Sequence, residues 1–135
     1  MNLTRHKIRE LAFQTLFAIE ANSATDKEMF FYALTKMNED EEIPQYFNVI
    51  VDGVLEHKSE LDSLISKYLS SGWSIQRIAK TDLIVLRVAF FEAKYVENIP
   101  ANVAINEALE ITKKYSDDRS RKFVNGVLSN IVSKD

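Results

Sequence analysis

The stretch DLIVLRVAFFEAKYV, residues Asp82 to Val96, decides the fold expected for this chain. Eleven of its fifteen residues are apolar, so a single helical stripe cannot account for them. A helix that is apolar nearly all round must be surrounded by other elements. Thr81 offers a hydroxyl to cap its start, and Pro100 disfavours helical geometry in the residue before it. The sequence therefore predicts a buried central helix.

The composition favours other helices around this one. Of 135 residues, 46% are apolar and 27% charged, with three glycines and two prolines. This is the composition of a globular chain with few helix breakers. We therefore expect an all-α fold in a single domain, residues 1–135, with subdomains of about 1–72 and 73–135.

Apolar spacing places the remaining helices along the chain. In the first half of the chain, helices are expected over about 4–21, 25–37, 44–55 and 61–69, and a capping box at Thr25–Glu28 opens the second of them. In the second half, besides the central helix, helices are expected over about 101–115 and over a last segment. The last helix is predicted to turn Val124, Val127, Leu128 and Ile131 inward. In the connector before the central helix, Trp73 is expected to pack rather than to bind.

The first helix carries two unusual pairs. Its predicted inward face comprises Ile8, Leu11, Ala12, Thr15 and Ile19. Phe13 and Phe17 fall roughly opposite, so they contact either another part of the fold or a partner. Arg5 and Arg9 are four residues apart, which predicts that both extend from one flank as an anion-binding pair.

Residues for catalysis are scarce. The chain has no cysteine, which excludes a disulfide, a thiolate metal site and a cysteine nucleophile. His6 and His57 lie in different predicted helices without carboxylates at metal-ligand spacing, and the glycines are isolated. We therefore expect no enzyme activity, cofactor or metal. With no window of roughly 18 apolar residues and no apolar run after the first basic residues, we expect a cytoplasmic protein without a membrane partner.

Charge is segregated along the chain, although its formal total is only −3. Residues 26–62 carry ten acidic and three basic side chains, whereas residues 113–135 carry three acidic and six basic ones. Basic side chains hold phosphates, while rings and amides engage unpaired bases. Two clusters combine these groups: Arg5, His6, Lys7 and Arg9, and Arg119, Arg121, Lys122, Phe123 and Asn125. If they are adjacent in space, they predict a surface for single-stranded RNA; ordinary surface charge is the alternative.

Residues 101–130, ANVAINEALEITKKYSDDRSRKFVNGVLSN, resemble the C-terminal signature of the bacterial transcription antitermination factor NusB family. VAINEALE at Val103–Glu110 and KFVNGVL at Lys122–Leu128 carry most of the resemblance. Weaker similarity covers Arg9–Phe17 and Arg77–Glu92. The resemblance implies two small helical bundles. It also implies binding of boxA RNA together with the ribosomal protein NusE, which helps RNA polymerase resist termination, notably in ribosomal RNA operons.

The resemblance also implies roles for individual residues. The implied RNA-binding residues are Arg5, His6, Lys7, Arg9, Lys122, Phe123 and Asn125, and the implied NusE-binding residues are Phe17 and Asp82, to which the helical-wheel argument adds Phe13. The family's N-terminal run is often a string of arginines, which His6 and Lys7 dilute here.

Three alternatives remain open from the sequence. A similar helical domain precedes the catalytic domain of some ribosomal RNA cytosine methyltransferases, of which this chain would be a fragment. A protein-interaction adaptor without an RNA role would use Phe13, Phe17 and the acidic middle. A homodimer formed through the exposed aromatic side chains of the first helix would compete with NusE.

Overall fold

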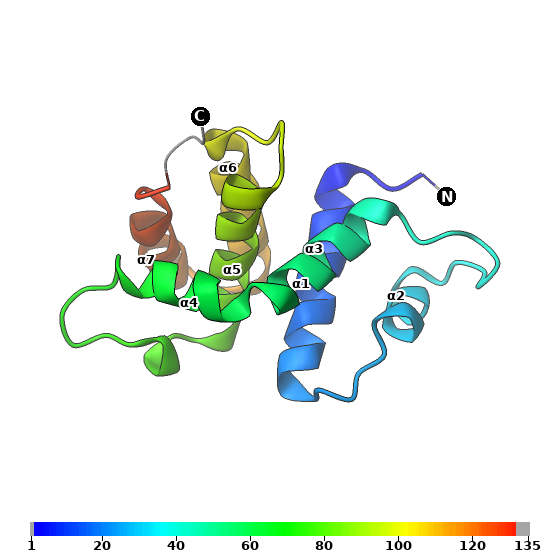
Figure 1. Cartoon of the computed structure of the whole chain (residues 1–135), viewed down its shortest axis with the longest axis horizontal. Helices are drawn as coiled ribbons and strands as arrows, with labels where there is room; N and C mark the ends of the chain where they lie inside the picture. Colours follow the sequence, from blue (N-terminus) through cyan, green and yellow to red (C-terminus); the bar gives the residue numbers. More distant parts are fainter. Residues whose placement is uncertain (1, 132–135) are drawn as a thin grey trace. The chain divides into compact units, whose positions relative to one another are not determined.

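The structure is a computed structural model that describes residues 2–131, and this range contains helices and no strand (Figure 1). The elements are α1 (Arg5–Ala21), α2 (Lys27–Thr35), α3 (Gln45–Glu56), α4 (Lys58–Ser66), the 3₁₀ helix η1 (Ile75–Arg77), α5 (Lys80–Tyr95), α6 (Ala101–Tyr115) and α7 (Asp118–Leu128). The predicted all-α class is confirmed.

The chain divides into two compact units, one ending at Gly53 and the other beginning at Val54. The first contains α1, α2 and most of α3, and the second contains α4 to α7. The sequence interpretation put this division near residue 72. It falls earlier because α4 packs against α5, which ties residues 58–66 to the second unit.

In the first unit, α1 begins where the sequence placed it. The Oγ1 of Thr4 accepts a hydrogen bond from the backbone N–H of Lys7 at 3.0 Å, which satisfies one of the free donors at a helix start. Four of the five residues expected inward are buried: Ile8, Leu11, Ala12 and Thr15. Thr15 buries its hydroxyl by donating to the carbonyl of Leu11 at 2.8 Å.

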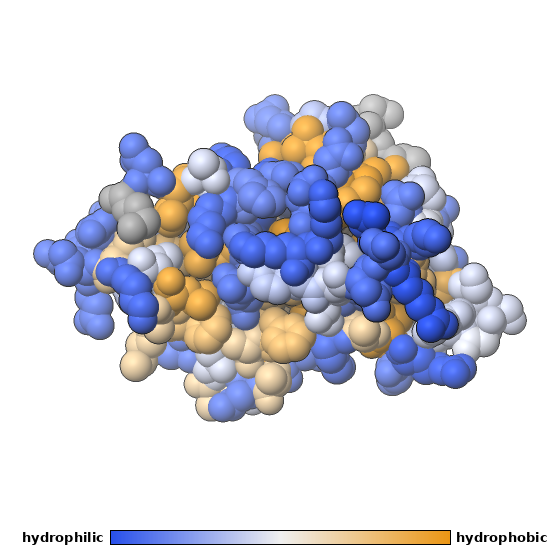
Figure 2. Space-filling model, turned by 180° about the vertical axis from the view of Figure 1, so that it is seen from behind, coloured by the Kyte–Doolittle hydropathy of each residue, from blue (hydrophilic) through white to orange (hydrophobic). Residues whose placement is uncertain are grey.

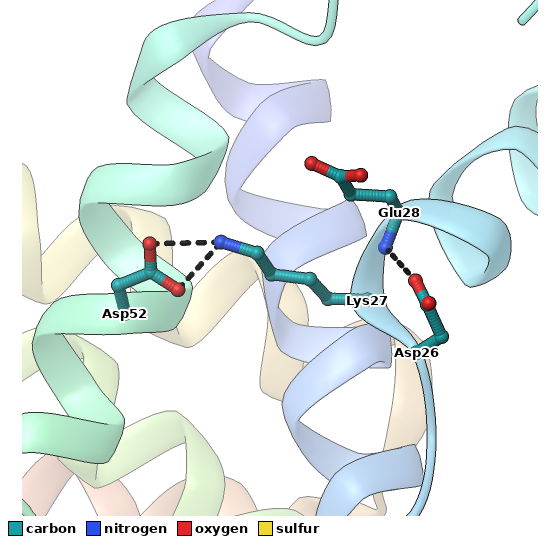
Figure 3. A network of polar contacts seen from close by, with 4 residues as sticks. All are labelled: Asp26, Lys27, Glu28 and Asp52. Atoms are coloured by element: carbon teal, nitrogen blue, oxygen red, sulfur yellow. Dashed lines mark hydrogen bonds and ion pairs between the residues drawn. The ribbon is translucent and has the colours of Figure 1, made fainter.

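The start of α2 differs from the prediction. Asp26, not Thr25, is the N-cap, and its carboxylate accepts from the backbone N–H groups of Glu28 and Met29. The Thr25 hydroxyl instead donates to the carbonyl of Asn22 at 2.7 Å, so the capping-box prediction is wrong. Figure 3 shows the neighbouring contact between helices, in which Lys27 Nζ of α2 lies 2.6 and 2.8 Å from the two carboxylate oxygens of Asp52 on α3.

In the second unit, α5 packs against α4, α6 and α7. Every residue from Asp82 to Ala93 is buried, which confirms the buried central helix. The helix begins two residues before the predicted start, with Ala79 at the N-cap, so the proposed Thr81 cap is wrong. Inside the unit, Arg87 on α5 donates from Nε and Nη2 to the two carboxylate oxygens of Asp62, at 2.7 and 2.9 Å.

Not all apolar surface is buried. Figure 2 shows one face on which hydrophobic residues lie exposed between hydrophilic ones. The exposed large apolar residues are Phe17, Met29, Leu34, Val49, Leu55, Tyr68, Trp73 and Tyr115. Within residues 2–131, the longest apolar helices fall short of what a membrane crossing requires.

Candidate nucleic-acid interface

The basic cluster of the first unit lies on the first two turns of α1. Arg5, His6 and Lys7 are all exposed. The guanidinium carbon of Arg5 lies 3.9 Å from the centre of the Tyr46 ring, a cation–π contact that fixes the side chain without neutralising its charge. Lys7 Nζ is 3.4 Å from a carboxylate oxygen of Glu10. An arginine, a histidine and a lysine are therefore exposed at a helix N-terminus, where the free backbone N–H groups also favour anions.

Arg9 does not belong to this exposed group. It is only 4% exposed, its guanidinium carbon lies 5.8 Å from the centre of the Tyr46 ring, and both it and its buried neighbour Glu10 have further interactions within the fold. The prediction that Arg5 and Arg9 extend together from one flank is wrong for Arg9. Helical spacing gave the flank correctly, but it could not show that the second turn of α1 is already covered.

The basic cluster of the second unit lies on α7. This helix is capped by Asp117, whose carboxylate accepts from the Ser120 N–H at 2.9 Å. Val124, Val127 and Leu128 are buried, as predicted. Lys122 and Asn125 are exposed and Phe123 is half-buried. One side of α7 therefore packs, while an ammonium, an amide and part of a ring remain available.

The Phe123 ring has an aromatic neighbour from another element. Its centre lies 5.9 Å from that of Trp73, with 35° between the ring planes. Trp73 was expected to pack, and it does contact Phe123, yet 48% of the residue stays exposed. The two clusters lie in different units, so the prediction that they form one surface stays a prediction.

Of the residues predicted to contact a protein partner, Phe17 is available and Phe13 is not. Phe17 is 40% exposed, whereas Phe13 is buried with its ring centre 6.4 Å from that of Phe17. For Phe13 the intramolecular alternative holds. The partner contact stays a prediction for both residues, and only Phe17 presents an exposed ring for it.

Asp82 is also buried, in the first turn of α5. The Ser116 hydroxyl lies 3.4 Å from its Oδ1. Burial raises the pKa of the Asp82 carboxyl, hydrogen bonds from Ser120 and Ser116 oppose that rise, and the charge of Asp117 adds to it. These bonds join α5 to the turn before α7 and to α7 itself, so Asp82 has an internal structural role, and its contact with NusE stays a prediction.

His57 packs against aromatic side chains of α5. The His57 ring stacks on the Tyr95 ring at 4.1 Å between centres. No cluster of three metal-ligating side chains occurs among residues 2–131.

Comparison with known proteins decides the family. The model of the NusB family matches residues 6–133. The chain belongs to the NusB family. Transcription antitermination protein NusB of Lactiplantibacillus plantarum is 55% identical to it, over 98% of this chain and 96% of its relative. The protein of the same name from Enterococcus faecalis is 50% identical, over 98% and 91%.

Solved structures agree with this assignment. T. maritima NusB is 34% identical with a TM-score of 0.83, covering 97% of this chain and 92% of that one. NusB from the crystal structure of antitermination factors NusB and NusE in complex with dsRNA is 26% identical, with a TM-score of 0.78 over 96% and 97%.

The NusB-like signature at Lys122–Leu128 divides between two roles in this fold. Its aliphatic residues build the core of the second unit, and Lys122 and Asn125 do not. Sequence reasoning did not assign Tyr46 to the surroundings of Arg5 in the first unit, or Trp73 and Arg77 to those of Phe123 in the second. A Gly-Trp pair in a loop with an arginine four positions on was the available signal for the last two.

Proposed function

We propose that this NusB-family chain is a bacterial transcription antitermination factor that acts in the cytoplasm. It binds boxA-type single-stranded RNA together with ribosomal protein NusE, and the assembly helps RNA polymerase resist termination, notably in ribosomal RNA operons. Family membership over residues 6–133 supports the role. A relative of the same fold has been solved with NusE and dsRNA, which supports NusE and an RNA as the partners.

One observation carries the assignment of the RNA surface. In the family signature on α7, Lys122 and Asn125 are exposed and Phe123 is half-buried, so packing does not require the ammonium and the amide. Ammonium, ring and amide are the groups that engage phosphate, base face and base edge of unpaired RNA. Arg5, His6 and Lys7 at the start of α1 supply a second set of contacts by the same chemistry.

For NusE, the proposed contact is the exposed ring of Phe17 on α1. An exposed aromatic side chain on a helix surface is a typical anchor of a protein interface. Phe13 supports this ring from within the first unit, because the two ring centres lie 6.4 Å apart. Asp82 lies in the second unit, where the Ser116 hydroxyl 3.4 Å from its Oδ1 joins the start of α5 to the turn before α7.

The test is an anisotropy titration of a boxA-type RNA and of a scrambled RNA of equal length, with and without NusE, over a range of salt. We expect the boxA-type RNA to bind more tightly and NusE to increase that difference. The slope of log affinity against log salt should fall by about 0.7 for each phosphate contact that is lost. Equal affinity for both RNAs, with and without NusE, would overturn the proposal.

A pair of lysine variants locates the surface. Lys122→Ala should reduce the salt slope, whereas Lys36→Ala, which removes the same charge from an exposed position close to the acidic run 39–42, should not. If both variants change RNA binding equally, the contact is general charge attraction and not the α7 surface.

A further inference from the structure

The loop between α4 and η1 holds an exposed tryptophan in a fixed position. The backbone N–H of Trp73 donates to the carbonyl of Ser70 at 3.0 Å, which closes a turn. Gly72, at the third position of this turn, has φ +90°, a conformation that side chains with a Cβ rarely adopt. The backbone therefore sets the direction from which Trp73 leaves the loop.

Arg77 secures the same loop from its other end. Its Nη1 donates to the carbonyl of Gly72 at 2.8 Å, and its guanidinium carbon lies 5.6 Å from the centre of the Trp73 ring. Arg77 is exposed, and the contacts of its guanidinium within residues 2–131 are with this carbonyl and this ring, neither of which carries a negative charge. Its charge is therefore available to an anion.

On its other side, Trp73 continues the surface of α7. Its ring contacts that of Phe123 at 5.9 Å between centres, and exposed Lys122 and Asn125 flank Phe123 in the helix. An indole, a phenyl ring and two unneutralised cations thus come from two segments about fifty residues apart and gather within the second unit.

We infer that Trp73 and Arg77 extend the α7 surface into a stacking platform for a base of unpaired RNA. The exposed indole face takes a base, and the guanidinium beside it takes an adjacent phosphate. An indole stacks on any base because every base has a π-face. Charge complementarity favours a polyanion over an apolar or basic protein segment, and the exposed stacking face beside the cations favours a nucleic acid over an acidic peptide. This inference rests on the proposed function and adds residues of the loop to its RNA surface.

Trp73 is the only tryptophan of the chain, so its fluorescence reports on this position alone. Selective tryptophan excitation of the full chain, titrated with the boxA-type RNA, should show quenching that saturates at the same RNA concentration as the anisotropy signal. NusE alone should leave the emission unchanged. Quenching by NusE without RNA would overturn the assignment of the platform to RNA.

Affinity measurements on variants supply the second readout. Trp73→Ala should weaken RNA binding about 5-fold to about 150-fold, the range expected for losing one stacked base, and Trp73→Phe should recover part of that loss. Arg77→Gln should make the salt slope shallower by about 0.7. Met29→Ala, which removes an even more exposed apolar side chain from α2, should bind RNA as the unmodified chain does.

The outcomes separate this inference from the function beneath it. If the unmodified chain binds boxA-type RNA, but neither the emission nor the affinity responds at position 73, the platform is wrong and the function stands. If the unmodified chain binds no RNA, with or without NusE, both are overturned. Circular dichroism melts of each variant show whether a lost affinity reflects unfolding, and Trp73→Phe keeps the test open if Trp73→Ala does not fold.

Discussion

Removing the Asp62 carboxylate tests how far the second unit depends on one buried ion pair. Asp62→Ala takes away the two carboxylate oxygens that accept from Nε and Nη2 of Arg87, at 2.7 and 2.9 Å. The Arg87 side chain is 4% exposed and that of Asp62 23%. Breaking a buried pair by removing one partner costs about 3–5 kcal/mol, because the remaining charge is left in the interior. Since water reaches part of Asp62, we expect the lower end, about 3 kcal/mol.

The assay is urea unfolding followed by tryptophan fluorescence, which reports on the second unit because Trp73 lies there. Asp52→Ala is the matched control, followed by circular dichroism. Its carboxylate also contacts its partner through both oxygens, at 2.6 and 2.8 Å from Lys27, but the Asp52 side chain is 58% exposed. A surface pair of this kind contributes roughly 0–1 kcal/mol.

The double variant Arg87→Met with Asp62→Leu completes the design. Replacing a buried pair by apolar residues of similar size is often neutral, so it should recover much of the stability that Asp62→Ala loses. The reasoning is refuted if Asp62→Ala costs no more than Asp52→Ala, or if the double variant is less stable than Asp62→Ala alone. Either result would mean that burial does not control the energetics of this pair.

Three further predictions concern individual side chains. Burial raises the pKa of the Asp82 carboxyl in the folded state, so ionisation of this carboxyl opposes folding. The stability that the protonated carboxyl contributes is fully present below the unfolded-state pKa and is lost as pH rises through the raised folded-state pKa. Asp82→Asn should therefore gain stability relative to the unmodified chain as pH rises through that range, measured by urea unfolding at several pH values, and a constant difference would contradict the assignment. Gly72→Ala should lose about 1–2 kcal/mol through its left-handed backbone and not through crowding, since no atom lies within 4 Å of the added Cβ; an unchanged urea midpoint would contradict this. Arg9→Ala should lower stability. Exposed Arg5→Ala should cost at most about 1 kcal/mol through its cation–π contact and should make the salt slope of RNA binding shallower by about 0.7; a shallower slope for Arg9→Ala and not for Arg5→Ala would show that Arg9 contacts the phosphates.

The helices were predictable because their apolar periodicity is long and uninterrupted. Every residue from Asp82 to Ala93 is buried. In the sequence this burial is visible as a nearly continuous apolar run, which one apolar face of a helix would not produce. Helix ends were less predictable where two capping residues stand side by side. Thr25 and Asp26 are both good N-caps. The Thr25 hydroxyl bonds instead to the carbonyls of Asn22 and Ala18, and these contacts are not visible in the spacing of the sequence.

The candidate site was predictable by residue type but not by exposure. Phe13 and Phe17 are equivalent on a helical wheel at four-residue spacing, as are Arg5 and Arg9. In each pair one member is buried and the other exposed. The difference comes from which other elements cover α1, and that information is spread over residues distant in sequence. The contact of Trp73 with Phe123 is hidden from the sequence for the same reason.

Two arginines ten residues apart show how this fold separates structure from binding. Arg87 lies on α5, where its guanidinium pairs with the Asp62 carboxylate. Its positive charge is therefore neutralised inside the second unit. Arg77 lies in the preceding 3₁₀ helix, where its contacts are a backbone carbonyl and an indole face, neither of which cancels its charge. Both fall within the segment that resembles the NusB family, so resemblance alone treats them alike. The two arginines differ in whether a carboxylate pairs with them. Arg77 keeps its charge beside an exposed ring and is available to a phosphate. Arg87 is paired with Asp62 in the interior and is not available.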